Sequence, residues 1–186
     1  MKLLDNKVAI IIGASSGIGR ATATLFAAQG AAVVINARGE KALDEVADKI
    51  SGAGGRVHAV AGDAGVAETH ARLVDAAASV FGGLDIAVNN AGGVGAAKPM
   101  AEILPEEWAY VLNVNLTSAF LGARYQIPAI LQRGGGSIVF TSSFVGTSVG
   151  IPGMSAYGAA KAGLMGLVKG ITADYATNGI RANALL

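Results

Sequence analysis

Residues 8 to 19 read Val8-Ala-Ile-Ile-Ile-Gly13-Ala-Ser-Ser-Gly17-Ile-Gly19, an apolar run that leads directly into a glycine-rich turn. The apolar run has the length of a buried strand and is too short for a helix. Gly13 permits a tight turn, Gly17 lets backbone approach a pyrophosphate, and Gly19 lets the next helix pack on the sheet. The amino terminus of that helix offers free N–H groups to phosphate oxygens. The pattern predicts a dinucleotide site, with a plain strand-to-helix connection as the alternative.

The same alternation continues beyond this turn, because short apolar runs are separated by longer helical patterns along the whole sequence. Such alternation is typical of an α/β fold with a parallel sheet and helices on both faces. Right-handed crossovers then give the doubly wound strand order 3-2-1-4-5-6 of a Rossmann fold. The expected strands lie near 7–12, 31–36, 56–61, 84–88, 136–141 and 180–185, and the expected helices near 17–29, 39–51, 66–81, 103–132 and 154–177.

The composition limits the number of domains, the kinds of site and the kinds of partner that the chain can have. The chain has 186 residues with 52% apolar content and no dividing linker or repeat, so residues 1–186 are expected to form one domain. A net charge of +1 gives no reason to expect a nucleic acid partner, and the absence of cysteine excludes disulfides and thiolate metal sites. His58 and His70 are expected on the surface, so no metal site is predicted. Without a signal-like or membrane-length apolar stretch, we expect a cytoplasmic protein that does not contact a membrane.

A second chemical motif is the pair Tyr157 and Lys161. A spacing of four on a helix places both side chains on one face. A free tyrosine titrates near pH ~10, and a neighbouring ammonium group favours its phenolate form. The pair therefore predicts a hydroxyl that exchanges protons near neutral pH. A half-buried tyrosine beside an exposed lysine is the alternative for this pair taken alone.

Together with two further motifs, these residues make the chain similar to the short-chain dehydrogenase/reductase family. The family pattern is T-G-x-x-x-G-I-G, then N-N-A-G, then Ser…Tyr-x-x-x-Lys. Its counterparts here are Ile12 to Gly19, Asn89-Asn90-Ala91-Gly92, and Ser143 with Tyr157 and Lys161. Within the family, the chain most resembles members similar to 3-oxoacyl-acyl-carrier-protein reductase. The family threonine is replaced by Ile12, so some local bracing of the Asn-Asn-Ala-Gly segment is expected to be lost.

The resemblance implies a catalytic role for four residues and interconversion of a ketone and a secondary alcohol. Ser143 would hydrogen-bond the substrate oxygen, Tyr157 would transfer the proton, and Lys161 would favour the phenolate and bind the nicotinamide ribose. Asn115 matches the fourth family residue, which holds a water connecting Lys161 to solvent. Ser142 next to Ser143, and Asn113 two residues before Asn115, have the same side chains but are expected to be ordinary structural residues.

The end of the second strand indicates NADP(H) as cofactor. A carboxylate there would bind the ribose hydroxyls of NAD, whereas this chain has Ala37 and then Arg38. Arg38 suits a 2′-phosphate, and a solvent-facing arginine is the alternative. Asp63 resembles the family's adenine-contacting aspartate and is also placed to cap a helix near Gly65.

The complete set of cofactor-binding residues implied by the resemblance spans the chain from the glycine turn to the Tyr-x-x-x-Lys motif. Asn36 is expected to add a hydrogen bond to the cofactor. The set comprises Gly13, Ser15, Ser16, Gly17, Ile18, Gly19, Arg38, Asp63, Ala64, Asn90, Ala91, Gly92, Tyr157 and Lys161.

The substrate is read from the uncharged segment between Ser143 and Tyr157, which predicts an apolar pocket wall suited to a hydrophobic ketone or an acyl chain. Ordinary core packing is the alternative for each of these residues. The expected wall residues are Phe144, Val145, Val149, Ile151 and Met154, with Val94 and Lys98 on the opposite lip.

The helices near 103–132 and 154–177 carry apolar or small residues on more than one face. The family pairs these helices across a two-fold axis, so a dimer or tetramer is expected. Family members also continue beyond the position of Leu186 with a substrate-covering segment and a last strand, so the chain is expected to be incomplete at its C-terminus. The rival to an enzyme is therefore a catalytically weak dinucleotide-binding or sensing module.

Overall fold

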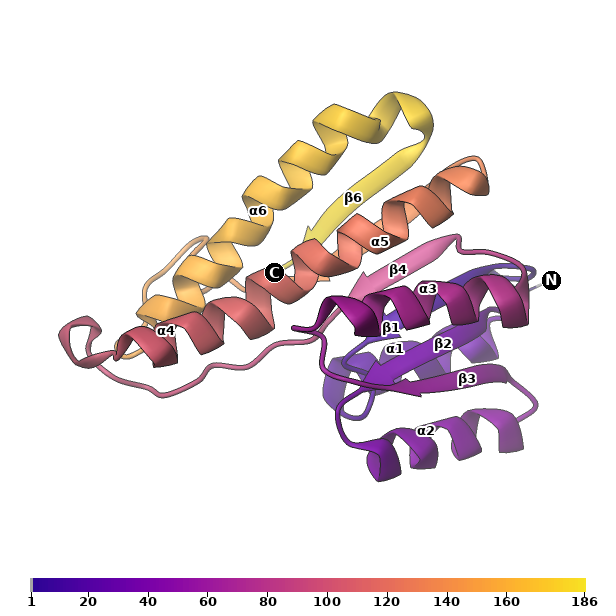
Figure 1. Ribbon diagram of the computed structural model, residues 1–186, viewed down its shortest axis with the longest axis horizontal. Helices are drawn as coiled ribbons and strands as arrows, with labels where there is room; N and C mark the ends of the chain where they lie inside the picture. Colours follow the sequence, from indigo (N-terminus) through magenta and orange to yellow (C-terminus); the bar gives the residue numbers. More distant parts are fainter. Residues whose placement is uncertain (1) are drawn as a thin grey trace.

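The computed structural model describes residues 2–186, in which six parallel strands form one sheet of order β3-β2-β1-β4-β5-β6 (Figure 1). This is the doubly wound α/β order that the alternation of apolar runs and helical patterns predicts. The strands are β1 (Val8–Ile12), β2 (Ala32–Ala37), β3 (Arg56–Ala61), β4 (Ile86–Asn89), β5 (Gly136–Thr141) and β6 (Ile180–Leu185). The helices are α1 (Gly17–Ala28), α2 (Glu40–Gly52), α3 (Ala67–Phe81), α4 (Pro105–Leu112), α5 (Ser118–Gln132) and α6 (Ser155–Tyr175).

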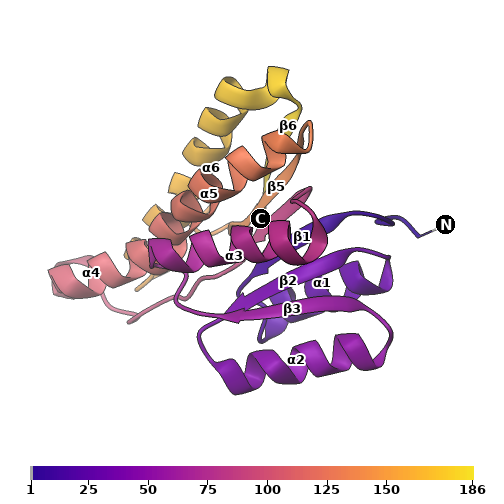
Figure 2. The ribbon, with the colours of Figure 1, turned by 45° about the vertical axis from the view of Figure 1, so that its right-hand side comes forward.

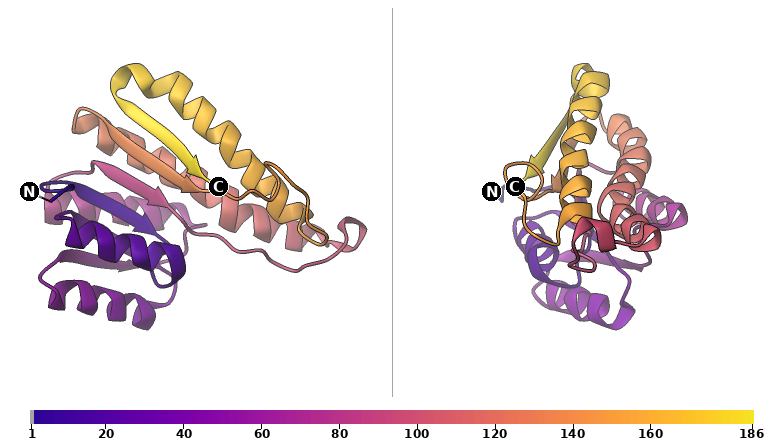
Figure 3. Two further views of the ribbon diagram at one scale, coloured as in Figure 1. Left: turned by 180° about the vertical axis from the view of Figure 1, so that it is seen from behind. Right: turned by 90° about the vertical axis from the view of Figure 1, so that its left-hand side faces the viewer.

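Helices cover the two faces of the sheet in separate sets. In Figure 1, α3 and α5 lie in front of the strands and α1 lies behind them, and the view from behind in Figure 3 reverses this order. Successive residues of β1 alternate between the faces, so Ile10 packs in the cluster of α3, α5 and α6, whereas Ile11 packs in the cluster of α1 and α2. Burial on both faces explains why β1 is a continuous apolar run.

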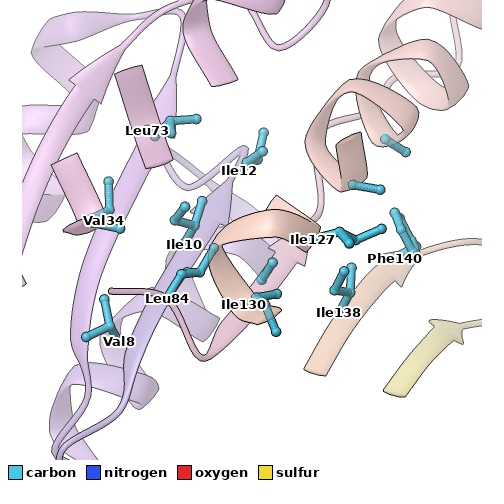
Figure 4. Close-up of a cluster of buried hydrophobic side chains, with 14 of the residues drawn as sticks. Val8, Ile10, Ile12, Val34, Leu73, Leu84, Ile127, Ile130, Ile138 and Phe140 are labelled. Atoms are coloured by element: carbon cyan, nitrogen blue, oxygen red, sulfur yellow. The ribbon is translucent and has the colours of Figure 1, made fainter. Parts of the chain in front are cut away.

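The larger core cluster occupies the face covered by α3, α5 and α6 (Figure 4). Ile10, Leu84 and Ile130 are completely buried there, and Phe140 is the largest fully buried side chain of the described residues. A parallel sheet that is packed on both faces forms a rigid support for the loops at the carboxyl ends of its strands.

The helix expected near 103–132 is interrupted by a π-helical turn, η2 (Asn113–Thr117), which separates α4 from α5. Asn115 lies in this turn, and its Nδ2 donates a hydrogen bond of 2.9 Å to the Val111 carbonyl. The Asn115 side chain thus donates to a backbone carbonyl of the preceding helical turn. Single π-turns within helices are frequently found at functional sites. The prediction of one uninterrupted helix was therefore wrong at this position.

The prediction that His70 lies on the surface was also wrong, because this side chain is only 1% exposed. His70, Leu73 and Ala77 recur at the spacing that places them on one face of α3. That face packs against the sheet and α5, which lies beside α3 in Figures 1 and 2. His58 is exposed, as expected.

Within residues 2–186, no helix combines the length and hydropathy needed to cross a membrane. The same residues contain no group of three or more His, Cys, Asp or Glu side chains placed to hold a metal ion.

Candidate functional site

A cavity of about 530 Å³ opens at the carboxyl ends of the strands, where the strand order reverses between β1 and β4. Open α/β sheets bind their ligands at such a reversal point. All the predicted cofactor-binding residues except Gly19 line the cavity. Lining residues that the sequence did not indicate as cofactor contacts are Ala37, Gly62, Gly93, Val94, Val114 and Thr141.

The glycine turn between β1 and α1 has the geometry that a phosphate cradle requires. Gly13 has a φ of +80°, in the left-handed region that favours glycine. A Cβ on Gly19 would overlap the Gly13 carbonyl oxygen, so Gly19 acts by close packing rather than by lining the cavity. A Cβ on Gly17 would meet nothing within 4 Å, and the first turn of α1 contains no acidic residue. The start of α1 is therefore open to an anion and carries no negative side chain to repel it.

Arg38 follows β2, is exposed and lines the cavity. In the described part of the chain, no carboxylate lies within ion-pair distance of its guanidinium group. Asn36 is only 1% exposed, and its Nδ2 donates to the carbonyls of Val60 and Gly62 at 2.9 and 3.1 Å. Asn36 therefore ties β2 to the end of β3, and its amide donor is engaged with backbone rather than free for the cofactor as expected.

Asp63 is exposed on the cavity wall that follows β3. Its Oδ1 accepts a hydrogen bond of 2.7 Å from the backbone N–H of Gly65. Because α3 begins only at Ala67 with Val66 as its N-cap residue, this contact closes a turn and does not cap the helix. The carboxylate thus stabilises the loop that carries it.

The Asn-Asn-Ala-Gly segment after β4 is held from both sides. Asn89 and Gln126 exchange two buried amide hydrogen bonds of 2.9 and 3.0 Å, which join β4 to α5. Asn90 donates to the Gly13 carbonyl at 3.2 Å and accepts from the Thr141 hydroxyl at 2.9 Å. Thr141 on β5 thus supplies a hydroxyl that braces this segment. Ile12 on β1, which replaces the family threonine, has no hydroxyl to do so.

Tyr157 and Lys161 lie on one face of α6, and both line the cavity. The Lys161 Nζ lies 5.6 Å from the centroid of the Tyr157 ring and donates a hydrogen bond of 2.7 Å to the Thr141 carbonyl. Lys161 is only 3% exposed, and this burial lowers its pKa from 10.5 to about 8. The side chain is therefore held by its surroundings beside the tyrosine ring.

Asn115 reaches the same place from η2. Its Nδ2 donates to the Gly93 carbonyl at 2.8 Å, and its Oδ1 accepts from the Gly93 N–H at 3.1 Å. A Cβ on Gly92 would meet both the Asn115 Oδ1 at 2.8 Å and the Lys161 Nζ at 3.2 Å. Asn115 and Lys161 therefore flank Gly92, which leaves no room there for a side chain.

The two serines after β5 point in different directions, as strand alternation predicts. Ser142 is buried, and its Oγ donates to the Lys161 carbonyl at 3.0 Å, which ties β5 to α6. Ser143 is half-buried, and its Oγ accepts from the Val145 N–H at 3.1 Å. Ser143 does not line the 530 Å³ cavity, so its contact with a substrate remains a prediction. Asn113 is exposed and contributes nothing to the cavity wall.

Comparison with known proteins identifies the family to which this arrangement belongs. A model of the short chain dehydrogenase family matches residues 7–186. The chain belongs to the short-chain dehydrogenase family. It is accordingly an oxidoreductase of alcohol and ketone substrates, and this family uses a nicotinamide dinucleotide, NAD or NADP.

Individual relatives are similar over most of this chain. A cyclohexanol dehydrogenase from Acinetobacter sp. (strain SE19) is 42% identical over 97% of this chain and 72% of its own length. A 3beta-hydroxysteroid dehydrogenase from Mediterraneibacter gnavus is 38% identical over 100% of this chain and 66% of its own length. The crystal structure of a 3-ketoacyl-ACP reductase from Sinorhizobium meliloti 1021 has a TM-score of 0.92 and 41% identity, and the match covers 95% of this chain and 70% of that one. The chain thus spans 66% to 72% of the length of these relatives.

Proposed function

We propose that this short-chain dehydrogenase is an NADP(H)-dependent enzyme that interconverts an uncharged apolar ketone and its secondary alcohol. The observation that carries the proposal is the buried Lys161 held beside Tyr157, in the same cavity as the glycine turn. A module that only binds dinucleotides does not need a buried ammonium group beside a phenol. Residues 1–186 would then act as one catalytic domain.

In the direction of reduction, a nicotinamide dinucleotide held by the glycine turn and the other residues of the cavity would supply a hydride to the carbonyl carbon. As the carbonyl π bond breaks, the Tyr157 hydroxyl gives its proton to the substrate oxygen. The Ser143 hydroxyl donates a hydrogen bond to the same oxygen and stabilises its developing charge. The Lys161 ammonium group stabilises the phenolate that remains on Tyr157. Oxidation reverses each step, with the phenolate accepting the alcohol proton.

The phenolate must regain a proton before the next reduction. Lys161 lines the cavity but is only 3% exposed, so little of its own surface meets solvent. Asn115 lies beside Gly92 together with Lys161 and holds the backbone of Gly93 through both atoms of its amide. We propose that Asn115 fixes this backbone so that a water molecule can connect Lys161 to solvent.

Arg38 supports NADP(H) over NAD(H). The chain places no acidic side chain at the end of β2, where one would bind the ribose hydroxyls of NAD. The Arg38 guanidinium group is exposed on the cavity wall and offers a planar pair of donors that match a phosphate group. The contact is charge-assisted, so it discriminates strongly against a cofactor without the 2′-phosphate.

The segment between β5 and α6 supports an apolar substrate. Phe144 and Val149 are 55% and 47% exposed, and Val94, predicted on the opposite lip, is 38% exposed. Lys98, the cation predicted on the opposite lip, forms a 2.6 Å ion pair with Glu107, so its charge is already balanced. Cyclohexanol and 3beta-hydroxysteroid dehydrogenases among the relatives are named for uncharged ring alcohols, which such a surface would accept.

We further propose that α5 and α6 form a subunit interface of a dimer or tetramer in the cytoplasm. Phe120 on α5 is 48% exposed, although the opposite face of this helix is buried in the core. Gly166 and Gly170 on α6 are exposed and would let a partner helix approach closely. An apolar strip of this kind on helices that already cover the sheet suits a symmetric copy of the same surface.

The experiment that tests the proposed function follows NADPH and NADH oxidation spectrophotometrically with a panel of ketones. The panel contains cyclohexanone, a steroid ketone, an acetoacetyl thioester and, as a charged control, a short 2-keto acid. We expect NADPH-dependent turnover with the uncharged apolar ketones and little with the keto acid. NADPH binding without turnover of any ketone would favour the dinucleotide-binding module instead.

A further inference from the structure

The segment from Val60 to Ala64, which covers the end of β3 and the start of the loop after it, has four backbone carbonyls held by side chains. The Asn36 amide donates to the carbonyls of Val60 and Gly62, and the Arg72 guanidinium group donates to that of Ala61 at 2.8 Å. Residues of this segment form the cavity wall at the end where the adenosine half of a dinucleotide would lie. The position of this segment is therefore set by side chains of β2 and α3.

The last contact of this series comes from His70 on α3. Its Nε2 lies 2.7 Å from the carbonyl oxygen of Ala64, and Ala64 lines the cavity. A carbonyl oxygen can only accept, so Nε2 must carry the hydrogen in this contact. The ring is 1% exposed and stacks on Tyr125 of α5, with centroids 6.3 Å apart and an interplanar angle of 14°. The imidazole is thus fixed between two helices with one donor aimed at the cavity wall.

The cost of placing a histidine here argues that the hydrogen bond matters. The Nδ1 atom of His70 is buried and has no hydrogen-bond partner in the described residues. Burial lowers the pKa of His70, so the ring is neutral at physiological pH. An apolar side chain would fill the same space without burying an unsatisfied nitrogen. Packing alone therefore does not account for the residue at this position.

We propose that His70 is a positioning residue that holds the Asp63–Ala64 wall in the conformation that binds the adenosine half of the cofactor. The inference rests on the proposed NADP(H) dependence. His70 does not touch the cofactor and acts through the Ala64 carbonyl. Losing the contact should weaken binding of the whole dinucleotide and leave the chemistry at Tyr157 unchanged.

The test compares three substitutions of His70 with the wild-type protein. His70→Gln keeps an amide N–H near the Nε2 position, His70→Asn carries the same amide on a shorter side chain that falls short of Ala64, and His70→Leu removes the donor. The dissociation constants of NADPH and of reduced nicotinamide mononucleotide, which lacks the adenosine half, are measured by fluorescence titration. The value of kcat at saturating NADPH and the melting temperature are measured in parallel.

We expect His70→Leu and His70→Asn to weaken NADPH binding about three- to ten-fold, the loss expected for one neutral hydrogen bond. His70→Gln should stay close to the wild type, and mononucleotide binding and kcat should be unchanged in all three variants. If His70→Leu fails to fold, the comparison of Gln with Asn decides the question. Equal NADPH affinity in the Gln and Asn variants would overturn the inference. A wild-type protein that binds no NADPH would instead overturn the proposed function, and this inference with it.

Discussion

The Lys161 Nζ lies 5.6 Å from the centroid of the Tyr157 ring, while its hydrogen bond of 2.7 Å is made to the Thr141 carbonyl on β5. Lys161 is thus anchored by the sheet and not by the tyrosine. The anchoring contact leaves the phenol oxygen of Tyr157 free to approach a substrate. The ammonium group nevertheless remains close enough to stabilise negative charge on the tyrosine.

The first prediction concerns pH. Burial lowers the pKa of Lys161 to about 8, so its ammonium form is present below that pH and is lost above it. The kcat/KM for ketone reduction should therefore decline as the pH rises through about 8, because kcat/KM reports ionisations of the free enzyme. Lys161→Arg, which stays charged, should remove the decline from whatever activity remains. A flat profile well above that pH would show that the Lys161 charge is not required.

The second prediction concerns cofactor choice. Arg38→Ala should raise the KM for NADPH about ten- to hundred-fold, since a hydrogen bond to a charged group contributes about 1.5–3 kcal/mol, and should leave the KM for NADH nearly unchanged. Arg181→Ala is the matched control, because Arg181 is an exposed arginine on β6 that does not line the cavity. If wild-type protein uses NADH as well as NADPH, Arg38 does not select the cofactor.

The third prediction separates glycines that look alike in the sequence. Gly19→Ala should lower the free energy of unfolding by about 1–3 kcal/mol, because its Cβ would meet the Gly13 carbonyl oxygen. Gly52→Ala should raise it by about 0.5 kcal/mol, because Gly52 is the last residue of α2, outside the proposed interface, with nothing within 4 Å of an added Cβ. Urea denaturation measures both. A Gly19→Ala variant as stable as the wild type would contradict the close packing of the turn.

The fourth prediction concerns assembly. Wild-type protein should be at least a dimer by light scattering at micromolar concentration, and Phe120→Asp should shift it towards monomer by placing a charge in the proposed interface. Leu25→Asp is the matched control, because Leu25 is 58% exposed on α1, away from the α5 and α6 surface. A wild-type monomer, or equal effects of the two substitutions, would argue against this interface.

The strands and the glycine turn could be predicted because their causes are local. An apolar run such as 8–12 is buried on both faces of a parallel sheet, and Gly13 and Gly19 are dictated by backbone geometry within the same turn. The π-helical turn at Asn115 could not be predicted from local sequence. The residues around it form an unbroken helical pattern, and the interruption accompanies side-chain contacts with Val111 and with the distant Gly93.

The roles of two polar residues near the site depended on tertiary contacts. Asn36 follows a buried strand and looks available to a ligand, but its amide is engaged by carbonyls at the end of β3. His70 was expected on the surface because a single histidine is usually polar and exposed. Its spacing of three from Leu73 and seven from Ala77 was a signal that it shares the buried face of α3.

The central claim is that Tyr157 transfers the proton in an NADPH-dependent ketone reduction. The most direct measurement compares Tyr157→Phe with the wild type for kcat on an apolar ketone and for NADPH affinity by titration. We expect kcat to fall about 10²–10⁴-fold, the usual contribution of general acid catalysis, with NADPH affinity changed little. A Tyr157→Phe variant that binds NADPH and retains most of the wild-type kcat would contradict the account.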